Sequence, residues 1–267
     1  MHKRVMDIVR MKNRKKIVTV TAYDYTMAAL CDEGGADILL VGDSAGMVML
    51  GYKSTIPVSM DEMCMFTGAV SRARRHALVV ADLPFSSYNI SRQEAIRNSG
   101  RLIQCGADAV KLEGGMTQAE TIRSIVDAGI PVMGHIGIQP QSAEILDGYG
   151  IRGESWEEAE SLQNDAYAIQ DAGAFSVVLE KVAAPTAKKI TDSINIPTIG
   201  IGSGVGCDGQ VLVMQDMLGM HKNNLRFVKQ YANLAEDIMG AINTYKEDVE
   251  KERFPSKEHS FGDDIKP

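Results

Sequence analysis

Acidic side chains stand at the ends of several short apolar runs in this chain. Four such runs lead into carboxylates at Asp43, Asp82, Glu113 and Glu180, and Lys111 lies just before the third of them. If the runs are parallel strands of one barrel, their carboxyl ends share a rim, and these side chains meet there. Four carboxylates repel one another in a partly dry cleft, so positive charge must accompany them.

The candidate ligands favour magnesium as the source of that positive charge. All of them carry oxygen atoms, and neither a histidine pair nor a thiolate cluster accompanies them, which favours Mg²⁺ over Zn²⁺. Asp43 and Asp82 are the best candidates for direct ligands, and Glu113 could act through a water molecule. We therefore expect a Mg²⁺ site formed by these three carboxylates.

The remaining charge at this rim indicates acid–base chemistry. Lys111 and Glu113 are two residues apart, so a strand places them on one face. A lysine within an apolar strand needs a partner. Lys111 and a divalent cation together offset three of the four negative charges, and a carboxylate with a raised pKa could absorb the excess. Such a carboxylate suits a general base acting on a weak carbon acid.

Each of these residues also has an ordinary structural interpretation. Asp82 stands before Leu83-Pro84 and could start a turn, whereas Glu180 could pair with a neighbouring lysine. His135, in the sequence Gly134-His135-Ile136-Gly137, could be a buried core histidine or could support the ligands from behind. Their coincidence at successive strand ends favours a common site over separate structural roles.

Eight apolar runs supply the strands that would position these residues. They are rich in Val and Ile and apolar at nearly every position, which is typical of parallel strands buried on both faces. The expected strands are Ile17–Thr21, Asp37–Val41, Leu78–Ala81, Ala109–Leu112, Pro131–Ile136, Ser176–Leu179, Thr198–Ile201 and Gln210–Met214.

Amphipathic segments between the runs carry helix start and stop signals. Four read as capping boxes, in which a hydroxyl residue precedes a glutamate by three positions: Ser59–Glu62, Ser91–Glu94, Thr117–Glu120 and Ser155–Glu158. Glycines suited to the left-handed conformation at a helix end precede four of the strands: Gly35, Gly106, Gly129 and Gly173.

The alternation of strands and helices predicts the α/β class, as either a closed or a doubly wound parallel sheet. No GxGxxG motif follows the first strand, so we favour a single-domain (β/α)8 TIM barrel over residues 1–267. Residues 225–248 read as a long helix that closes the ring, and 249–267 as an extended tail. The glycine-rich segment 200–204 either holds a phosphate or makes a tight turn; we favour the turn.

Composition restricts the class of function. The 267 residues carry a formal net charge of −7, which argues against nucleic-acid binding. No apolar run approaches the length of a membrane span, and no signal peptide is evident. The four cysteines are far apart in sequence, which indicates reduced, mostly buried thiols and a cytoplasmic protein.

The chain resembles a known family over nearly its whole length. The similarity rests on motifs that occur in the same order as in the ketopantoate hydroxymethyltransferase family: Thr19-Val20-Thr21-Ala22-Tyr23-Asp24, Val41-Gly42-Asp43-Ser44, Ala81-Asp82-Leu83-Pro84-Phe85, Val110-Lys111-Leu112-Glu113-Gly114, Gly134-His135-Ile136-Gly137, Cys207-Asp208-Gly209-Gln210-Val211 and 254–261. Together these motifs are highly specific.

The resemblance implies a reaction and a set of residues. Members of the family fold as (β/α)8 barrels and transfer a hydroxymethyl group from 5,10-methylenetetrahydrofolate to 3-methyl-2-oxobutanoate. The product, 2-dehydropantoate, leads to pantothenate and coenzyme A. The resemblance implies that Asp43, Asp82 and Glu113 serve Mg²⁺, that Asp43, Ser44, Asp82 and Lys111 bind substrate, and that Glu180 is the base. It also implies a cytoplasmic homo-oligomer, commonly a decamer in bacteria.

Two positions depart from the family pattern. The family usually reads Leu-Thr-Pro-Gln where this chain has Ile138-Gln139-Pro140-Gln141, and it usually has alanine at the position of Ser203. Neither change falls on an expected metal or base position.

Three other functions remain open from the residues. An isocitrate-lyase-like enzyme would also use Mg²⁺ and an enolate, but its Lys-Lys-Cys-Gly-His loop is absent. A phosphosugar enzyme would bind phosphate at 200–204. A catalytically inactive binding scaffold would have no use for clustered buried charge.

Overall fold

Eight parallel strands close into a barrel in the computed structural model of this chain, which describes residues 2–143, 150–221 and 225–262. The strands follow one another around the barrel in chain order, and the last pairs with the first. They are β1 Ile17–Thr21, β2 Ile38–Val41, β3 Leu78–Asp82, β4 Ala109–Lys111, β5 Val132–Gly137, β6 Ser176–Glu180, β7 Thr198–Ile201 and β8 Gly209–Leu212. The predicted (β/α)8 barrel is confirmed, and each strand lies within two residues of its predicted bounds.

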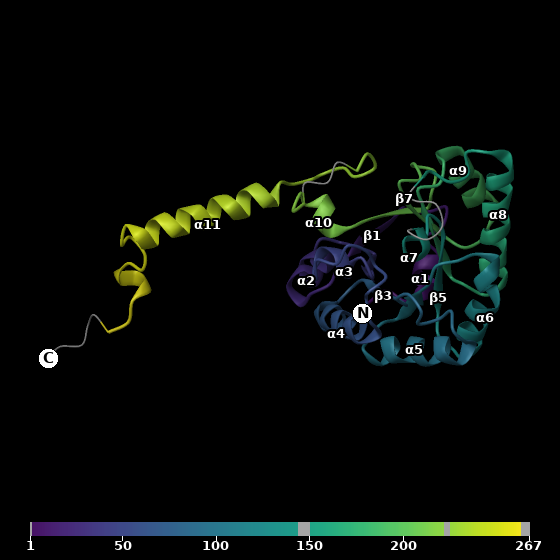
Figure 1. Cartoon of the computed structure of the whole chain (residues 1–267), viewed down its shortest axis with the longest axis horizontal. Coiled ribbons are helices and arrows are strands. Elements are labelled where there is room, and N and C mark those ends of the chain that lie inside the picture. Colours follow the sequence, from purple (N-terminus) through teal and green to yellow (C-terminus); the bar gives the residue numbers. More distant parts are fainter. Residues whose placement is uncertain (1, 144–149, 222–224, 263–267) are drawn as a thin grey trace. The chain divides into compact units, whose positions relative to one another are not determined.

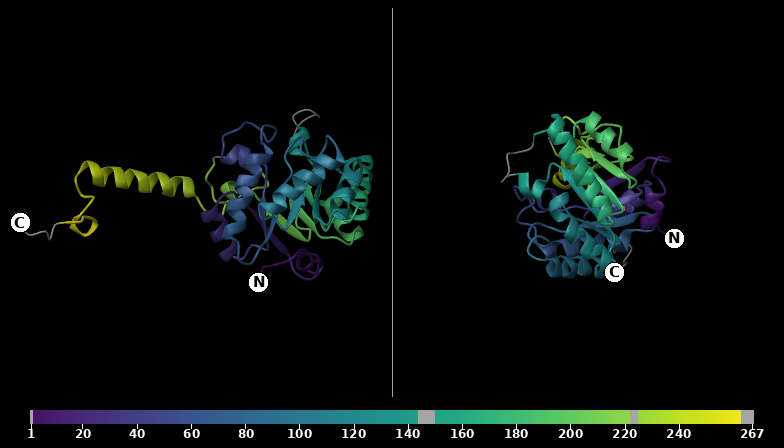
Figure 2. Two further views of the ribbon diagram at one scale, coloured as in Figure 1. Left: turned by 90° about the horizontal axis from the view of Figure 1, so that it is seen from below. Right: turned by 90° about the vertical axis from the view of Figure 1, so that its right-hand side faces the viewer.

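Helices lie on the outside of the barrel (Figures 1 and 2). Those of the barrel unit are α1 Val5–Val9, α2 Tyr25–Glu33, α3 Ala45–Val48, α4 Met60–Ala73, α5 Arg92–Gln104, α6 Ala119–Asp127, α7 Pro140–Ala143, α8 Trp156–Asp171 and α9 Ala184–Ser193, with a 3₁₀ turn η1 at Met116–Gln118. The four glycines predicted at helix ends all have positive φ angles, between 85° and 105°.

The predicted capping box is confirmed in full at Ser59, where Glu62 accepts in return from the Ser59 N–H, whereas at Ser91 and Ser155 only the serine half is present. The hydroxyls of Ser59, Ser91 and Ser155 each accept a hydrogen bond from the backbone N–H three residues on. The prediction at Thr117 is wrong, because this residue lies in η1 and α6 begins only at Ala119. There the N–H of Gln118 donates to the carbonyl of Gly115, so the tighter turn replaces the side-chain cap.

The inside of the barrel is apolar at its amino end and polar at its carboxyl end. A buried cluster contains alternate residues of the strands, among them Leu78, Val80, Ala109, Met133 and Val178. Since side chains two residues apart in a strand point to the same face, the next inward positions belong to the polar residues at the strand ends. The apolar layers thus form a floor beneath the predicted site.

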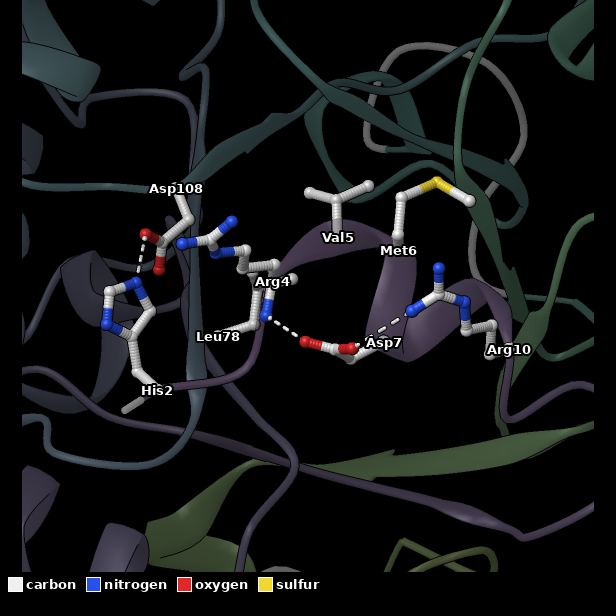
Figure 3. A pocket seen from close by; sticks show the side chains of 8 residues that line it. All are labelled: His2, Arg4, Val5, Met6, Asp7, Arg10, Leu78 and Asp108. Atoms are coloured by element: carbon white, nitrogen blue, oxygen red, sulfur yellow. Dashed lines mark hydrogen bonds and ion pairs between the residues drawn. The ribbon is translucent and has the colours of Figure 1, made fainter.

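Helix α1 covers the amino end of the barrel. Its Ile8 is fully buried within the same apolar cluster. A cavity of about 700 Å³ lies beside this helix (Figure 3). In this view His2 pairs with Asp108, and Asp7 accepts from the backbone of Arg4. None of the predicted site residues is among the described residues that line this cavity.

The remainder of the chain forms a second compact unit, Gln215–Pro267, whereas the barrel occupies Met1–Met214. Helix α10 spans Met214–Met217. The long helix α11 covers Leu234–Glu250, so the prediction that it starts at Leu225 is wrong. The intervening residues include Phe227, Val228 and Tyr231, whose aromatic and β-branched side chains favour helix weakly. That α11 closes the ring stays a prediction.

The segment 249–267 was expected to be extended. Instead, α11 continues through Glu250, and a 3₁₀ turn, η2, follows at Lys257–His259. Residues 263–267 of this segment lie outside the described part of the chain.

The structure bears on two expectations drawn from composition, which concern membrane spans and the cysteines. Within the described ranges, no helix is long and apolar enough to cross a membrane. All four cysteines are free, but only Cys207 is buried; Cys31, Cys64 and Cys105 are half-buried, so the expectation that most of these thiols are buried is wrong.

The carboxylate of Asp32 fastens α2 to the start of β3. It is 3% exposed and accepts hydrogen bonds from the backbone N–H groups of Arg75, His76 and Ala77, at 2.7 to 3.1 Å. Burial would raise the pKa of this carboxyl, but the three hydrogen bonds outweigh it and lower the pKa. The ionised carboxylate therefore stabilises the loop that orients β3 and its terminal Asp82.

We expect Asp32→Ala to lower the free energy of unfolding by about 3 kcal/mol, because it leaves three backbone donors without their partner. Urea denaturation at pH 7 measures this loss. Asp127→Ala is the matched control, since Asp127 also ends a helix before a strand but is exposed. Equal destabilisation by the two substitutions would contradict the role assigned to Asp32.

Candidate active site

The carboxyl ends of three strands deliver charged side chains to one rim of the barrel. Asp82 is the last residue of β3, Lys111 the last of β4 and Glu180 the last of β6, and His135 lies within β5. Each follows an apolar residue of the barrel interior by two positions, such as Val80 before Asp82. The structure therefore brings the predicted residues of these strands together.

Asp43 and Ser44 reach the same rim from the loop after β2. The backbone N–H of Asp43 donates to Oδ2 of Asp82 at 3.1 Å. The hydroxyl of Ser44 lies 2.8 Å from that of Tyr23. A Cβ atom at Gly42 would lie 2.7 Å from the Ser44 hydroxyl, so a larger residue there would displace that hydroxyl from its present position.

Lys111 is the central cation of the site. It is 4% exposed, and its Nζ lies 3.0 Å from Oδ1 of Asp82. Burial by itself lowers the pKa of this amine, but the charges of Asp82, Glu113 and Asp43 outweigh the effect and raise the pKa above its usual value. The ammonium form of Lys111 is therefore held firmly by the surrounding carboxylates.

Two carboxylates of the site hold their protons unusually tightly. Burial, followed by the negative charge of Asp82, raises the pKa of Asp43 to about 7, although Lys111 and a hydrogen bond from Gln141 act in the opposite direction. Burial and the charge of Asp43 raise the pKa of Glu113 well above its usual value. Burial, together with the neighbouring carboxylates, therefore favours the protonated form of Asp43 and Glu113.

His135 lies between the charged groups. Its Nε2 is 3.3 Å from Oε2 of Glu180, and its Nδ1 is 3.4 Å from Nζ of Lys111 and 3.6 Å from Oε1 of Glu113. Burial and the positive charge of Lys111 lower the pKa of His135, although Glu180 acts in the opposite direction. A neutral imidazole can donate to the Glu180 carboxylate from Nε2 and thereby orient it.

Glu180 is the carboxylate of the site that solvent reaches most easily. Its side chain is 19% exposed, whereas those of Asp82 and Glu113 are at most 4% exposed. Gly137 makes room for the Glu180 backbone: it has a φ of +96°, and an added Cβ would lie 2.2 Å from the Glu180 carbonyl oxygen. Of the four carboxylates, Glu180 is thus the one best placed to meet a substrate.

The donor set suits a divalent cation of the magnesium type. Among the described residues, no group of three or more His, Cys, Asp or Glu side chains is arranged to hold a metal ion. Mg²⁺, however, typically takes only one or two carboxylates and fills its remaining positions with water and substrate oxygens. Asp82 and Asp43 are buried side by side, and Lys111, 3.0 Å from Oδ1 of Asp82, is the cation that accompanies them. The two carboxylates fit such an ion.

Sequence reasoning missed the polar residues that connect the site. Gln141 and Tyr88 are 2% and 3% exposed, and they link Asp43 to Glu113 through hydrogen bonds. Tyr23 contacts Ser44 and also lay outside the predicted set. Tyr23 and Gln141 occur in motifs of the family, but nothing in their spacing identified their partners.

The glycine-rich segment 200–204 forms a turn that supports β6. The hydroxyl of Ser203 is fully buried, donates to the carbonyl of Leu179 at 2.7 Å and accepts from the N–H of Val182 at 3.0 Å. Gly202 and Gly204 have φ angles of +66° and +78°. These contacts favour the turn over a phosphate cradle, and they give Ser203 a role that alanine could not fill.

The raised pKa of Asp43 predicts a pH-dependent stability in protein freed of metal by a chelator. Because the folded state holds this proton more tightly than the unfolded state, stability falls as pH rises from about 4 to about 7. We therefore expect the free energy of unfolding of the wild type to decrease over this range relative to that of Asp43→Asn. Urea denaturation at each pH measures the difference, with Asp171→Asn as the surface control. A constant difference would contradict the assignment.

Comparison with known proteins gives a single family. Residues 2–257 match the sequence model of the family described as ketopantoate hydroxymethyltransferase. A 3-methyl-2-oxobutanoate hydroxymethyltransferase of Nitrosopumilus maritimus (strain SCM1) is 59% identical over 266 residues, which cover 99% of this chain and 95% of that protein. The enzyme of the same name from Pyrococcus abyssi (strain GE5 / Orsay) is 52% identical, covering 94% of this chain and 89% of that protein.

Solved structures share the fold at low identity. A phosphoenolpyruvate phosphomutase from Streptomyces platensis subsp. rosaceus superposes with a TM-score of 0.62 at 15% identity, covering 99% of this chain and 92% of that one. A 2,3-dimethylmalate lyase of the PEP mutase/isocitrate lyase superfamily gives 0.60 at 16% identity, covering 98% and 93%. The match over nearly the whole chain and the identity to curated relatives show that this protein is an enzyme of the ketopantoate hydroxymethyltransferase family.

Proposed function

We propose that the protein transfers a hydroxymethyl group from 5,10-methylenetetrahydrofolate to 3-methyl-2-oxobutanoate and so forms 2-dehydropantoate. The identity of 59% to a relative named 3-methyl-2-oxobutanoate hydroxymethyltransferase carries this proposal. The site supports it, because the reaction requires a base for a weak carbon acid and a cation to hold a 2-oxo acid, and the rim has the partly exposed Glu180 and the ammonium group of Lys111. In this assignment the product supplies pantothenate and coenzyme A biosynthesis.

Asp43, Ser44, Asp82 and Lys111 bind the 2-oxo acid in this proposal. Lys111 keeps its ammonium form and has three donors, of which one serves Asp82 and one can reach Nδ1 of His135. The third can meet the substrate carboxylate or the keto oxygen. The hydroxyl of Ser44, held beside that of Tyr23, offers a further donor at the same rim. Donors aimed at an oxygen that gains negative charge stabilise the transition state.

Mg²⁺ is the proposed cofactor, held by Asp43 and Asp82 with Glu113 acting through water. When bound, it would act as a Lewis acid that stabilises the developing enolate. The backbone N–H of Asp43 donates to the Asp82 carboxylate and so holds that carboxylate beside the loop that carries Asp43.

Glu180 is the proposed general base. It removes the proton from C3, the branched carbon beside the ketone, and the enolate then attacks the methylene carbon delivered by the folate. Water then supplies the hydroxyl group as the bond between the transferred carbon and the folate nitrogen breaks, and tetrahydrofolate leaves with the proton. His135 supports this role, because its Nε2 lies 3.3 Å from the Glu180 carboxylate and can orient it between substrate and solvent.

We also propose that the protein is a homo-oligomer of the cytoplasm, with the decamer as the form that the family resemblance suggests. Free, half-buried cysteines suit a reducing compartment. Helix α11 presents an apolar stripe at Ile238, Ile242, Tyr245 and Val249, each 45% to 58% exposed. Contiguous exposed apolar surface of this kind is typical of a protein–protein interface.

Deuterium exchange at C3 of 3-methyl-2-oxobutanoate tests the first half of the reaction. We expect the enzyme to catalyse exchange in D₂O when Mg²⁺ is present and folate is absent, because proton removal precedes the attack on the methylene carbon. Proton NMR follows the loss of the C3 signal. Glu180→Gln should slow the exchange by about 10²- to 10⁴-fold, the usual contribution of a general base.

Glu33→Gln is the matched control, because Glu33 is exposed and ends α2 at the amino end of the barrel, opposite to the rim. If Glu180→Gln retained near-wild-type exchange, another residue would be the base. If the wild type gave no exchange with Mg²⁺, the measurement would be repeated with tetrahydrofolate. Absence of exchange there too would argue against this substrate.

The oligomer is tested on the apolar stripe of α11. We expect the wild type to sediment as a multimer and Ile238→Lys/Ile242→Lys to sediment as a smaller species, because buried lysines would lack partners. Analytical ultracentrifugation measures both. Asn243→Lys, on the same helix but on the face away from the stripe, serves as the control. A wild type that sediments as a monomer would refute the proposal.

A further inference from the structure

Gln141 connects three loops of the candidate site by itself. It lies in α7, within the loop after β5, and its side chain is 2% exposed. One amide hydrogen of Nε2 donates to Oδ2 of Asp43 at 2.7 Å, and the other to the carbonyl of Leu83 at 3.0 Å. The loops after β2 and β3 are therefore fastened to the loop after β5 through one amide group.

The remaining polar atoms of Gln141 bind the loop after β4 and a tyrosine. Its backbone N–H donates to Oε2 of Glu113 at 3.1 Å, and its Oε1 accepts from the hydroxyl of Tyr88 at 2.8 Å. That hydroxyl in turn accepts from the backbone N–H of Glu113 at 3.3 Å. Every hydrogen-bonding atom of the Gln141 side chain thus has a partner, which fixes the orientation of the amide.

The chemistry of these contacts requires an amide at position 141. Both Asp43 Oδ2 and the Leu83 carbonyl are acceptors, so the group between them must supply two hydrogens. A carboxylate would present acceptors to acceptors and would add a fifth negative charge to the rim. An apolar side chain would leave a buried carboxylate oxygen without its donor.

These hydrogen bonds restrict the orientation of the Asp43 carboxylate. With Oδ2 engaged by Gln141, the carboxylate cannot rotate freely, and Oδ1 is left as the oxygen that can meet a cation or a substrate. The neighbouring Asp82 is held at both oxygens, because its Oδ2 accepts from the backbone N–H of Asp43 and its Oδ1 lies 3.0 Å from Nζ of Lys111. Oδ1 of Asp43 is thus the carboxylate oxygen whose direction depends most on Gln141.

We propose that Gln141 is a positioning residue, which holds the Asp43 carboxylate in the orientation needed to bind a divalent cation at the rim of the barrel. This inference rests on the proposed function, since it takes Asp43 as a cation ligand. It adds a residue that touches neither the cation nor the 2-oxo acid and acts through Asp43 alone. Tyr88 supports it by locking the amide so that its nitrogen faces Asp43.

Isothermal titration of the full-length protein with Mg²⁺ alone, without substrate, tests the role directly. Gln141→Met keeps the approximate volume of the side chain but removes all three of its hydrogen bonds. We expect it to weaken Mg²⁺ binding by about 10- to 100-fold, as loss of a hydrogen-bonding partner of a metal ligand typically does. Tyr88→Phe should weaken binding in the same direction but by less, since the amide remains.

Gln163→Met is the matched control. Gln163 also uses its amide to reach a tyrosine hydroxyl, that of Tyr167 on α8, but away from the rim. We expect it to bind Mg²⁺ as the wild type does. Thermal unfolding of each metal-free protein separates a general loss of stability from a loss of cation affinity.

A kinetic measurement separates positioning from damage to the fold. With Gln141→Met, the rate of C3 exchange should fall at low Mg²⁺ and recover as Mg²⁺ is raised in proportion to the weaker binding. A merely structural defect would lower the rate at every Mg²⁺ concentration. Wild-type affinity in folded Gln141→Met would overturn the inference.

If Gln141→Met does not fold, the Mg²⁺ affinity of Tyr88→Phe tests the inference instead. Wild-type affinity of that variant for Mg²⁺ would overturn the inference. The proposed reaction fails separately. A wild type that binds Mg²⁺ but exchanges no C3 proton would refute the reaction, whereas the ratio of Mg²⁺ affinities would still support or refute the role of Gln141.

Discussion

The ion pair between Lys111 and Asp82 lies inside the barrel, with 3.0 Å between Nζ and Oδ1 and both side chains nearly buried. A buried ammonium group is costly unless carboxylates surround it, and here several do. Those carboxylates exceed the charge of Lys111, so burial and mutual repulsion raise the pKa of Asp43 and Glu113. Without a further cation, the carboxylates of the site therefore outnumber its positive charges. This imbalance of charge underlies the chemistry proposed for the site.

The architecture of the barrel determines where this excess of negative charge can be accommodated. Its lower layers are filled by alternate apolar residues of the strands, and Ile8 of α1 completes the packing at the amino end. The charged residues of the site stand at the ends of β3, β4 and β6, where solvent and substrate have access. The apolar layers below the rim stabilise the barrel, so charged residues are tolerated at the rim. This arrangement is common in barrels of this type.

Hydrogen bonds between loops then give the rim its geometry. Strand ends alone fix Asp82, Lys111 and Glu180, but Asp43 and Glu113 stand on loops that must be held. Gln141 and Tyr88 hold them through an uninterrupted chain of buried hydrogen bonds. Ser203 likewise holds the end of β6, because its hydroxyl forms hydrogen bonds with the backbone of Leu179 and Val182, on either side of Glu180. Charged groups are thus positioned by neutral ones.

The sequence by itself determined the strands, the barrel and the charged residues of the site. Eight Val- and Ile-rich runs and three serine caps carry local signals, and the period of two along each strand places Lys111 and Asp82 on the inner face. The family was accessible too, because its motifs are contiguous and run in order through the chain. Each of these features depends on neighbours in sequence.

Only the tertiary structure decided which side chains meet. The contact between Gln141 and Asp43 joins residues 98 positions apart, and that between Tyr88 and Gln141 joins residues 53 apart. Nothing in local spacing encodes such pairs, since closure of the barrel brings the loops together. The turn η1 replaced the predicted cap at Thr117 for the related reason that a backbone hydrogen bond to Gly115 competed with the side chain. Period and capping are local properties of the chain, whereas the partners of a buried amide depend on how the whole barrel closes.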